Sequence, residues 1–169
     1  ILFNLFCLLL KINNVSSSKP KIFISFSTKD MGYCKEFIRH LDSPQYEFWY
    51  QEEINIGQDY KKIIRQNIYS SVATVLLLSN NFLNSKFINE EELPWIVEKD
   101  QESNIYDIFP VQIDSCNWEK IEFLKDKQIF PSKTKSLNFS DQSQINILRK
   151  QILTYFGNAG YIKKKGWFR

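Results

Sequence analysis

Three consecutive glutamates, Glu90, Glu91 and Glu92, stand where a carboxylate can serve a binding or catalytic site. They follow a largely apolar run, Val72 to Leu78, and a polar loop rich in asparagine and serine. Such a run is typical of a strand that is buried on both faces of a parallel sheet. Ligands of these sheets bind beyond the carboxyl ends of the strands. The loop after this strand would therefore deliver a carboxylate to the ligand-binding edge.

The glutamates also have a purely structural interpretation. Acidic residues at the start of a helix interact favourably with the positive end of the helix dipole. A catalytic carboxylate would instead stabilise positive charge that develops in a transition state. The residues alone leave both interpretations open.

Composition narrows the classes of function. The 169 residues predict one domain with a core of its own, and a net charge of +3 gives no argument for a nucleic acid partner. Three widely spaced cysteines form neither a disulfide framework nor a metal site, which suits the reducing cytoplasm. The single histidine, His40, leaves zinc sites and Ser–His catalysis without their usual ligand or base. We therefore expect a cytoplasmic protein without metal or cofactor.

The two ends of the chain differ from its middle. Residues 1–20 join an apolar stub, ILFNLFCLLLK, to a polar linker, and the first residue is Ile rather than Met. The stub is either a sequence artefact or fragment end, or the remnant of an N-terminal membrane anchor, so anchoring stays open. Residues 158–169 form a basic tail. The domain is expected at 21–157.

Strands alternate with helices through the domain. Asp30 is expected to cap the helix that follows the first strand. The strands are predicted at residues 21–26, 46–50, 72–78, 106–113 and 136–139, and the main helices at 31–41, 60–68, 87–99 and 142–156. This alternation predicts an α/β, flavodoxin-like three-layer fold with a five-stranded parallel sheet of order 2-1-3-4-5. The loops 27–30 and 79–92 would then meet at the point where the strand order reverses.

Two relatives of this fold fit that edge poorly. A receiver domain needs aspartates where this chain has Ser27 and Ser79, and no glycine-rich phosphate loop is present. The chain instead resembles the Toll/interleukin-1 receptor (TIR) domain of bacterial proteins. The resemblance rests on four segments in order: KIFISFSTKD, EFWYQEEINIGQDYKKIIRQNIYSS, LLLSNNFLNSKFINEEELPWI and FPVQIDSCNWEKIEFLKDKQIFP.

The resemblance implies a function. Many TIR domains hydrolyse NAD+ at the nicotinamide–ribose bond, and some cyclise the ADP-ribose product, whereas others are non-catalytic adaptors that act by association. The enzymes use a glutamate of the third helix, followed by Leu and by apolar residues four and five positions on. Glu92, with Leu93, Ile96 and Val97, fits this pattern, and Glu91 does not. We therefore expect Glu92 to be catalytic.

The resemblance also suggests the surroundings of NAD+, which would be substrate rather than cofactor. The family often has Trp four residues before the glutamate, where this chain has Ile88. The expected substrate contacts are Phe26, Ser27, Thr28, Ile54, Gly57, Ser79, Phe87 and Ile88. Ile54 and Gly57 belong to the BB loop, through which such domains self-associate. An upstream sensor and a role in anti-phage or cell-death signalling are further expectations.

Overall fold

Four parallel strands form the sheet, in the order β2-β1-β3-β4. The computed structural model describes residues 19–52, 59–104 and 106–157 of the chain. The strands are β1 (Lys21–Ser25), β2 (Glu47–Tyr50), β3 (Ala73–Leu78) and β4 (Asp107–Gln112). All six residues of β3 are buried, as expected for a central strand of a parallel sheet.

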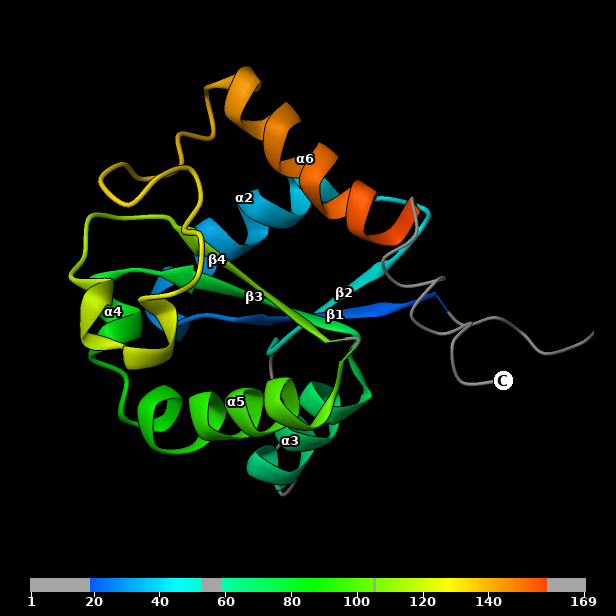
Figure 1. Ribbon diagram of the computed structural model, residues 1–169, viewed down its shortest axis with the longest axis vertical. Helices are drawn as coiled ribbons and strands as arrows, with labels where there is room; N and C mark the ends of the chain where they lie inside the picture. Colours follow the sequence, from blue (N-terminus) through cyan, green and yellow to red (C-terminus); the bar gives the residue numbers. More distant parts are fainter. Residues whose placement is uncertain (1–18, 53–58, 105, 158–169) are drawn as a thin grey trace, which may run out of the picture.

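Helices cover both faces of the sheet (Figure 1). They are α2 (Met31–Leu41), α3 (Tyr60–Ser70), α4 (Asn80–Leu83), α5 (Leu93–Glu102) and α6 (Gln142–Gly157). Helices α2 and α6 lie over one face, and α3 and α5 lie over the other. Short 3-10 turns occupy Thr28–Asp30, Trp118–Lys120 and Glu122–Leu124. The predicted α/β, flavodoxin-like three-layer architecture is confirmed.

The predicted fifth strand at residues 136–139 is wrong. Beyond β4, Phe130 forms an isolated bridge with Val111, and the Leu137 N–H donates to the Gln112 carbonyl at 2.7 Å. Pro131 has no N–H to continue a ladder after Phe130. Polar and apolar residues alternate in the segment SLNF, as they do in a strand. In the structure, however, only the Leu137 N–H of this segment donates to β4, so no regular fifth strand forms at this edge.

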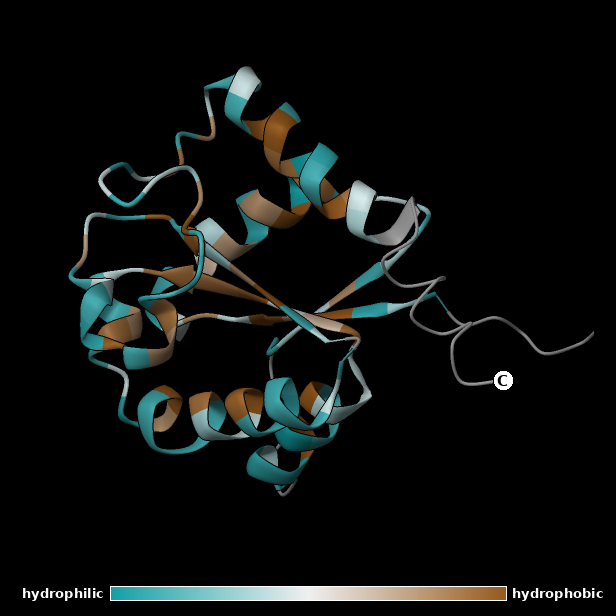
Figure 2. Ribbon diagram, viewed as in Figure 1, coloured by the Kyte–Doolittle hydropathy of each residue, from teal (hydrophilic) through white to brown (hydrophobic). Residues whose placement is uncertain are grey.

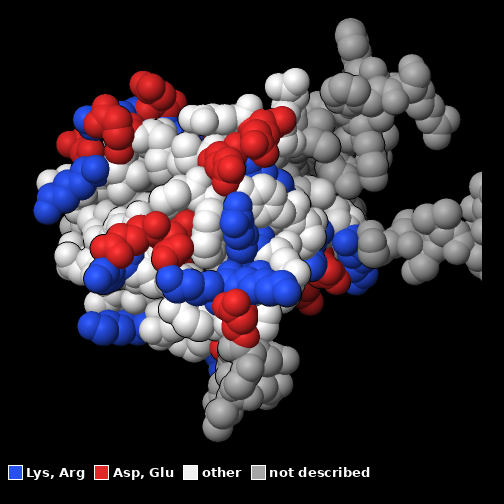
Figure 3. Space-filling model, turned by 90° about the horizontal axis from the view of Figure 1, so that it is seen from below, with Lys and Arg blue, Asp and Glu red and all other residues white. Residues whose placement is uncertain are grey.

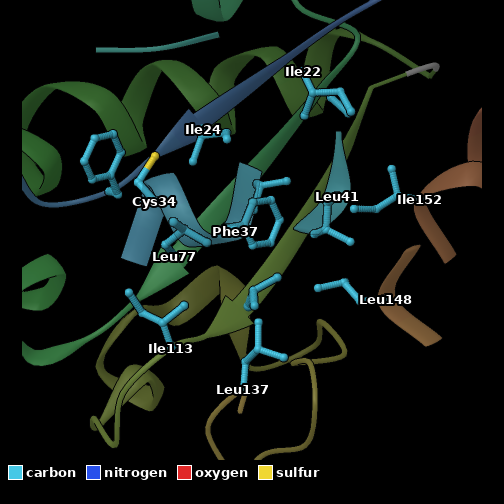
Figure 4. Close-up of a cluster of buried hydrophobic side chains, with 14 of the residues drawn as sticks. Ile22, Ile24, Cys34, Phe37, Leu41, Leu77, Ile113, Leu137, Leu148 and Ile152 are labelled. Carbon is cyan, nitrogen blue, oxygen red and sulfur yellow. The ribbon is translucent and has the colours of Figure 1, made fainter. Parts of the chain in front are cut away.

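The sheet separates two hydrophobic clusters. Figure 2 shows hydrophobic residues along the central strands and on the side of α5 that faces them. The first cluster lies under α2 and α6 (Figure 4) and includes Ile22, Ile24, Phe26, Phe37 and Leu148. The second lies under α3 and α5 and includes Phe23, Ile64, Leu76, Ile88 and Ile96. Alternate residues of β1 enter opposite clusters, as strand geometry requires.

A π-helical turn, Ile88–Glu92, leads into α5. Its defining bond runs from the Leu93 N–H to the Ile88 carbonyl, five residues back. Pro94, which follows in the first turn of α5, cannot donate to the Glu90 carbonyl, and its ring crowds that group. The helix therefore widens before the proline. Sequence analysis predicted a helix over 87–99 but not this turn.

Candidate active site at Glu92

Glu92 is the last residue of the π-helical turn and is buried, with 4% of its surface exposed. Leu93 and Ile96 on the following turn are also buried and belong to the second cluster. Residues four apart on a helix share a face, so Glu92 lies on the same side as Ile96. Because α5 packs its apolar side against the sheet, the Glu92 carboxylate at its start is buried on that same side.

Ser25 is the partner of this carboxylate. It ends β1, and its Oγ donates to Glu92 Oε2 at 2.6 Å. Within β1, Ser25 has the same orientation as Phe23, two residues earlier, which packs in the second cluster. Ser25 is paired in register with Leu76 of the neighbouring strand β3. The carboxylate is therefore anchored at the carboxyl end of a central strand, where ligands of this architecture bind.

The pKa of Glu92 is raised from 4.5 to about 7 because burial penalises the charged form. The hydrogen bond from Ser25 lowers the pKa, but by less than burial raises it. Within residues 19–52, 59–104 and 106–157, no charged side chain contributes to this pKa. Near neutral pH both the protonated and the ionised form of Glu92 are therefore populated.

The two oxygens of Glu92 differ. Oε2 accepts from Ser25, whereas Oε1 has no hydrogen-bond partner in the described part of the chain. Oε1 is also not among the fully enclosed atoms without a partner, which are Gln112 Oε1 and Arg149 Nε. It thus retains contact with the surface. One oxygen is therefore held by a hydrogen bond from Ser25, and the other is not hydrogen-bonded within the described residues.

The neighbouring glutamates face elsewhere. Glu91 Oε1 lies 2.5 Å from Lys61 Nζ of α3, and the exposed Glu90 lies 3.9 Å from Lys86. Figure 3 views the molecule from the side of α3 and α5, where acidic and basic side chains are intermixed. Arg65 and Glu98 form a further pair between these helices, at 3.9 Å. Of the three glutamates, Glu92 is the one that is buried.

A second polar cluster joins the loops after β1 and β3. The carboxylate of Asp30 is buried and accepts from Ser79 Oγ at 2.6 Å and from Asn81 Nδ2 at 2.7 Å. Ser79 in turn caps α4, because its Oγ accepts from the Phe82 N–H. Asp30 occupies the N-cap position of α2 as expected, but its side chain makes no capping bond and bonds to the other loop instead. The predicted meeting of the two loops is confirmed.

The other expected substrate contacts fall into separate environments. Ser27 is buried and Thr28 is exposed on the first loop, and Phe26 packs in the first cluster, on the opposite face from Phe23 and Ser25. Ile88 is buried in the second cluster. Ile54 and Gly57 lie outside the described residues.

Phe87 belongs to an aromatic group on the α3–α5 side. Its ring lies 5.2 Å from that of Tyr60 and 6.3 Å from that of Trp95, between centroids. It is half-buried and packs against the second cluster. An aromatic ring thus precedes Ile88 in the chain, and its ring contacts are with Tyr60 and Trp95.

Ser25 was missed by the sequence analysis. The available signal was a hydroxyl at an inward-facing position of an otherwise apolar strand, KIFIS. A buried polar group requires a hydrogen-bond partner, so the Ser25 hydroxyl indicates that another part of the chain supplies an acceptor. The sequence does not identify that acceptor.

In the described residues, no three His, Cys, Asp or Glu side chains gather in a way that could hold a metal ion. None of the helices in those residues combines the length and hydrophobicity needed to cross a bilayer.

Comparison with known proteins agrees with this architecture. A family model described as TIR domain matches residues 22–149. A probable 2' cyclic ADP-D-ribose synthase, TcpO, of Methanobrevibacter olleyae is 32% identical over 83 residues, which cover 48% of this chain and 24% of that protein. The uncharacterized protein y4lF of Sinorhizobium fredii (strain NBRC 101917 / NGR234) is 24% identical over 110 residues, or 63% and 34% of the two chains. The chain thus spans between a quarter and about a third of the length of these relatives. It belongs to the TIR domain family.

Proposed function

We propose that this TIR domain cleaves the nicotinamide–ribose bond of NAD+, with Glu92 as the catalytic residue. The observation that carries the proposal is the buried carboxylate at the ligand-binding edge, with one oxygen held by Ser25 and the other open. The products would be nicotinamide and ADP-ribose or a cyclic variant of it. The relative named as a probable 2' cyclic ADP-D-ribose synthase supports a reaction of this class.

Cleavage of the nicotinamide–ribose bond mainly requires a negative charge near the ribose carbon. When the bond breaks, its electron pair passes to the pyridinium nitrogen, and nicotinamide leaves as a neutral ring. Positive charge then develops on the ribose carbon, and an ionised carboxylate stabilises this transition state more than the ground state. Water adds to the carbon and loses a proton to give ADP-ribose. In a cyclic product, a hydroxyl group of the ADP-ribose replaces the water.

Burial makes the charge of Glu92 effective. A carboxylate in a low-dielectric site interacts more strongly with a cation than one in water does. The same burial raises the pKa to about 7, so the active, ionised form is fully populated only above neutral pH. The rate of NAD+ cleavage should therefore rise with pH through about 7.

Substitution of two adjacent glutamates tests the assignment. Glu92→Gln keeps the size and the buried environment but removes the charge, and it should reduce NAD+ consumption about 100- to 1000-fold. Glu91→Gln is the matched control: its carboxylate pairs with Lys61 at the surface, and its loss should change the rate by less than about threefold. NAD+ loss is measured on purified, concentrated protein at pH 8. A Glu92→Gln variant as fast as wild type would show that the assignment is wrong.

We further propose that activity depends on self-assembly through the BB loop, in anti-phage or cell-death signalling. NAD+ would then be consumed only when an upstream sensor or high local concentration brings copies together. If the wild-type protein assembles but consumes no NAD+, the enzymatic function is refuted. The alternative function, a non-catalytic adaptor that acts by domain association, would then be the better description.

A further inference from the structure

The hydrogen bond from the Ser25 hydroxyl to Glu92 affects the ionisation of the carboxylate. Ser25 and Glu92 are 1% and 4% exposed, and they come from elements 67 positions apart in the chain. Both residues are almost fully buried, so the Ser25 hydroxyl is the donor that the described chain provides for Oε2, at 2.6 Å. Removing it would leave Oε2 without a donor in a buried site, which disfavours the charged form.

The direction of the bond depends on the protonation of Glu92. An ionised carboxylate can only accept, so Ser25 must donate to it. A protonated carboxyl can donate as well as accept and depends less on any one donor. The hydroxyl therefore stabilises the ionised form selectively.

No cation shares this task in the described residues. On α3, Lys61 is engaged with Glu91 of the π-helical turn. On the same turn, Glu90 is exposed and faces Lys86. At the ends of β1 and β3, the Asp30 carboxylate is held by Ser79 and Asn81. None of these groups contributes to the pKa of Glu92, whereas Ser25 does.

We propose that Ser25 is a positioning residue, which keeps Glu92 ionised and turns its free oxygen Oε1 toward the ligand. Its use in catalysis rests on the proposed function, but its effect on Glu92 does not. The activity of the enzyme near neutral pH would thus be set by a neutral hydroxyl on a central strand rather than by a neighbouring cation.

The first test follows Glu92 directly. Protein labelled with carbon-13 at the glutamate side-chain carboxyl is titrated by NMR, and the Glu92 signal is assigned by its absence in Glu92→Gln. Ser25→Ala should move the titration midpoint upward from about 7 by roughly one pH unit. Ser25→Thr keeps the hydroxyl and should keep the midpoint. An unchanged midpoint in Ser25→Ala would overturn the proposal, whether or not the protein consumes NAD+.

The control is a hydroxyl of the same kind at another place. Thr74 of β3 is also buried and bonds to the Tyr106 hydroxyl rather than to Glu92. Thr74→Val should lower the free energy of unfolding without moving the Glu92 midpoint. If Thr74→Val and Ser25→Ala move the midpoint equally, the effect is one of general destabilisation, and the proposal fails.

The second test uses the pH dependence of NAD+ cleavage. Ser25→Ala should be about fivefold slower than wild type at pH 7 and should come close to the wild-type rate at pH 9, where Glu92 is largely ionised in both. Equal loss at both pH values would contradict a role in ionisation. An inactive wild type would refute the proposed function, while the NMR titration would still decide the role of Ser25.

Discussion

Replacing Glu92 by Gln should make the protein more stable at alkaline pH, at the expense of activity. In the unfolded chain Glu92 ionises near 4.5, whereas in the folded chain burial holds its pKa at about 7. Between these values the folded state keeps a proton that the unfolded state has released. The stability of the wild type therefore falls as pH rises through this window, and the cost is fully present above 7.

The size of the effect follows from the two pKa values. One pH unit corresponds to about 1.4 kcal/mol, so charged Glu92 costs the folded state about 3 kcal/mol above pH 7. Gln carries no charge and can still accept from Ser25, but burial of its amide N–H groups offsets about 1 kcal/mol. Glu92→Gln should therefore raise the free energy of unfolding by about 2 kcal/mol at pH 8.5, or the melting temperature by about 5 °C.

The assay is urea unfolding followed by circular dichroism from pH 4.5 to pH 8.5. The difference in the free energy of unfolding, Glu92→Gln minus wild type, should grow from pH 4.5 to about pH 7 and then level off, because at pH 4.5 Glu92 is largely protonated in the folded state and costs less than about 1 kcal/mol. Glu91→Gln loses a partly exposed ion pair and should stay close to wild type, without a comparable rise in stability toward alkaline pH. A gap that is the same at both ends of the range, or a variant less stable than wild type at pH 8.5, would refute the reasoning. Such a trade of stability for function is common where a charge must be buried to act.

Two further predictions concern the loops and assembly. Asp30→Ala should lower the free energy of unfolding by about 2 kcal/mol in urea, because the buried Ser79 hydroxyl loses its acceptor; the exposed Asp126→Ala is the control, and equal values for the two variants would show that the network contributes nothing. NAD+ consumption per molecule should rise with protein concentration if copies must assemble, and a constant specific activity over a wide dilution series would contradict assembly.

Local sequence was sufficient for most of the fold. Apolar positions spaced three and four apart predicted α2, α3 and α6, and the apolar run before Ser79 predicted the buried β3. These patterns are reliable because helix and strand geometry fix which residues share a face. The same reasoning failed at residues 136–139, where pattern alone cannot say whether a backbone reaches the sheet edge.

The order of the elements also located the ligand-binding edge. Once strands alternate with helices, the loops after β1 and β3 must meet, and the bond between Asp30 and Ser79 confirms that they do. Asp30 lies at the predicted N-cap position, but its side chain does not make the capping bond. An Asp before a helix can cap it or bond elsewhere, and the choice depends on what the fold brings near.

The chain by itself determined the fold class, the resemblance to TIR domains and the presence of a carboxylate at the edge of the sheet. Only the tertiary structure decided how that carboxylate is held. Pro94 widens the helix at Ile88–Glu92, and the sheet brings Ser25 to within 2.6 Å of Glu92 across 67 positions of sequence. Burial, and with it a pKa near 7, depends on neighbours from several elements at once. No local pattern records such neighbours, because they are set by packing between distant segments.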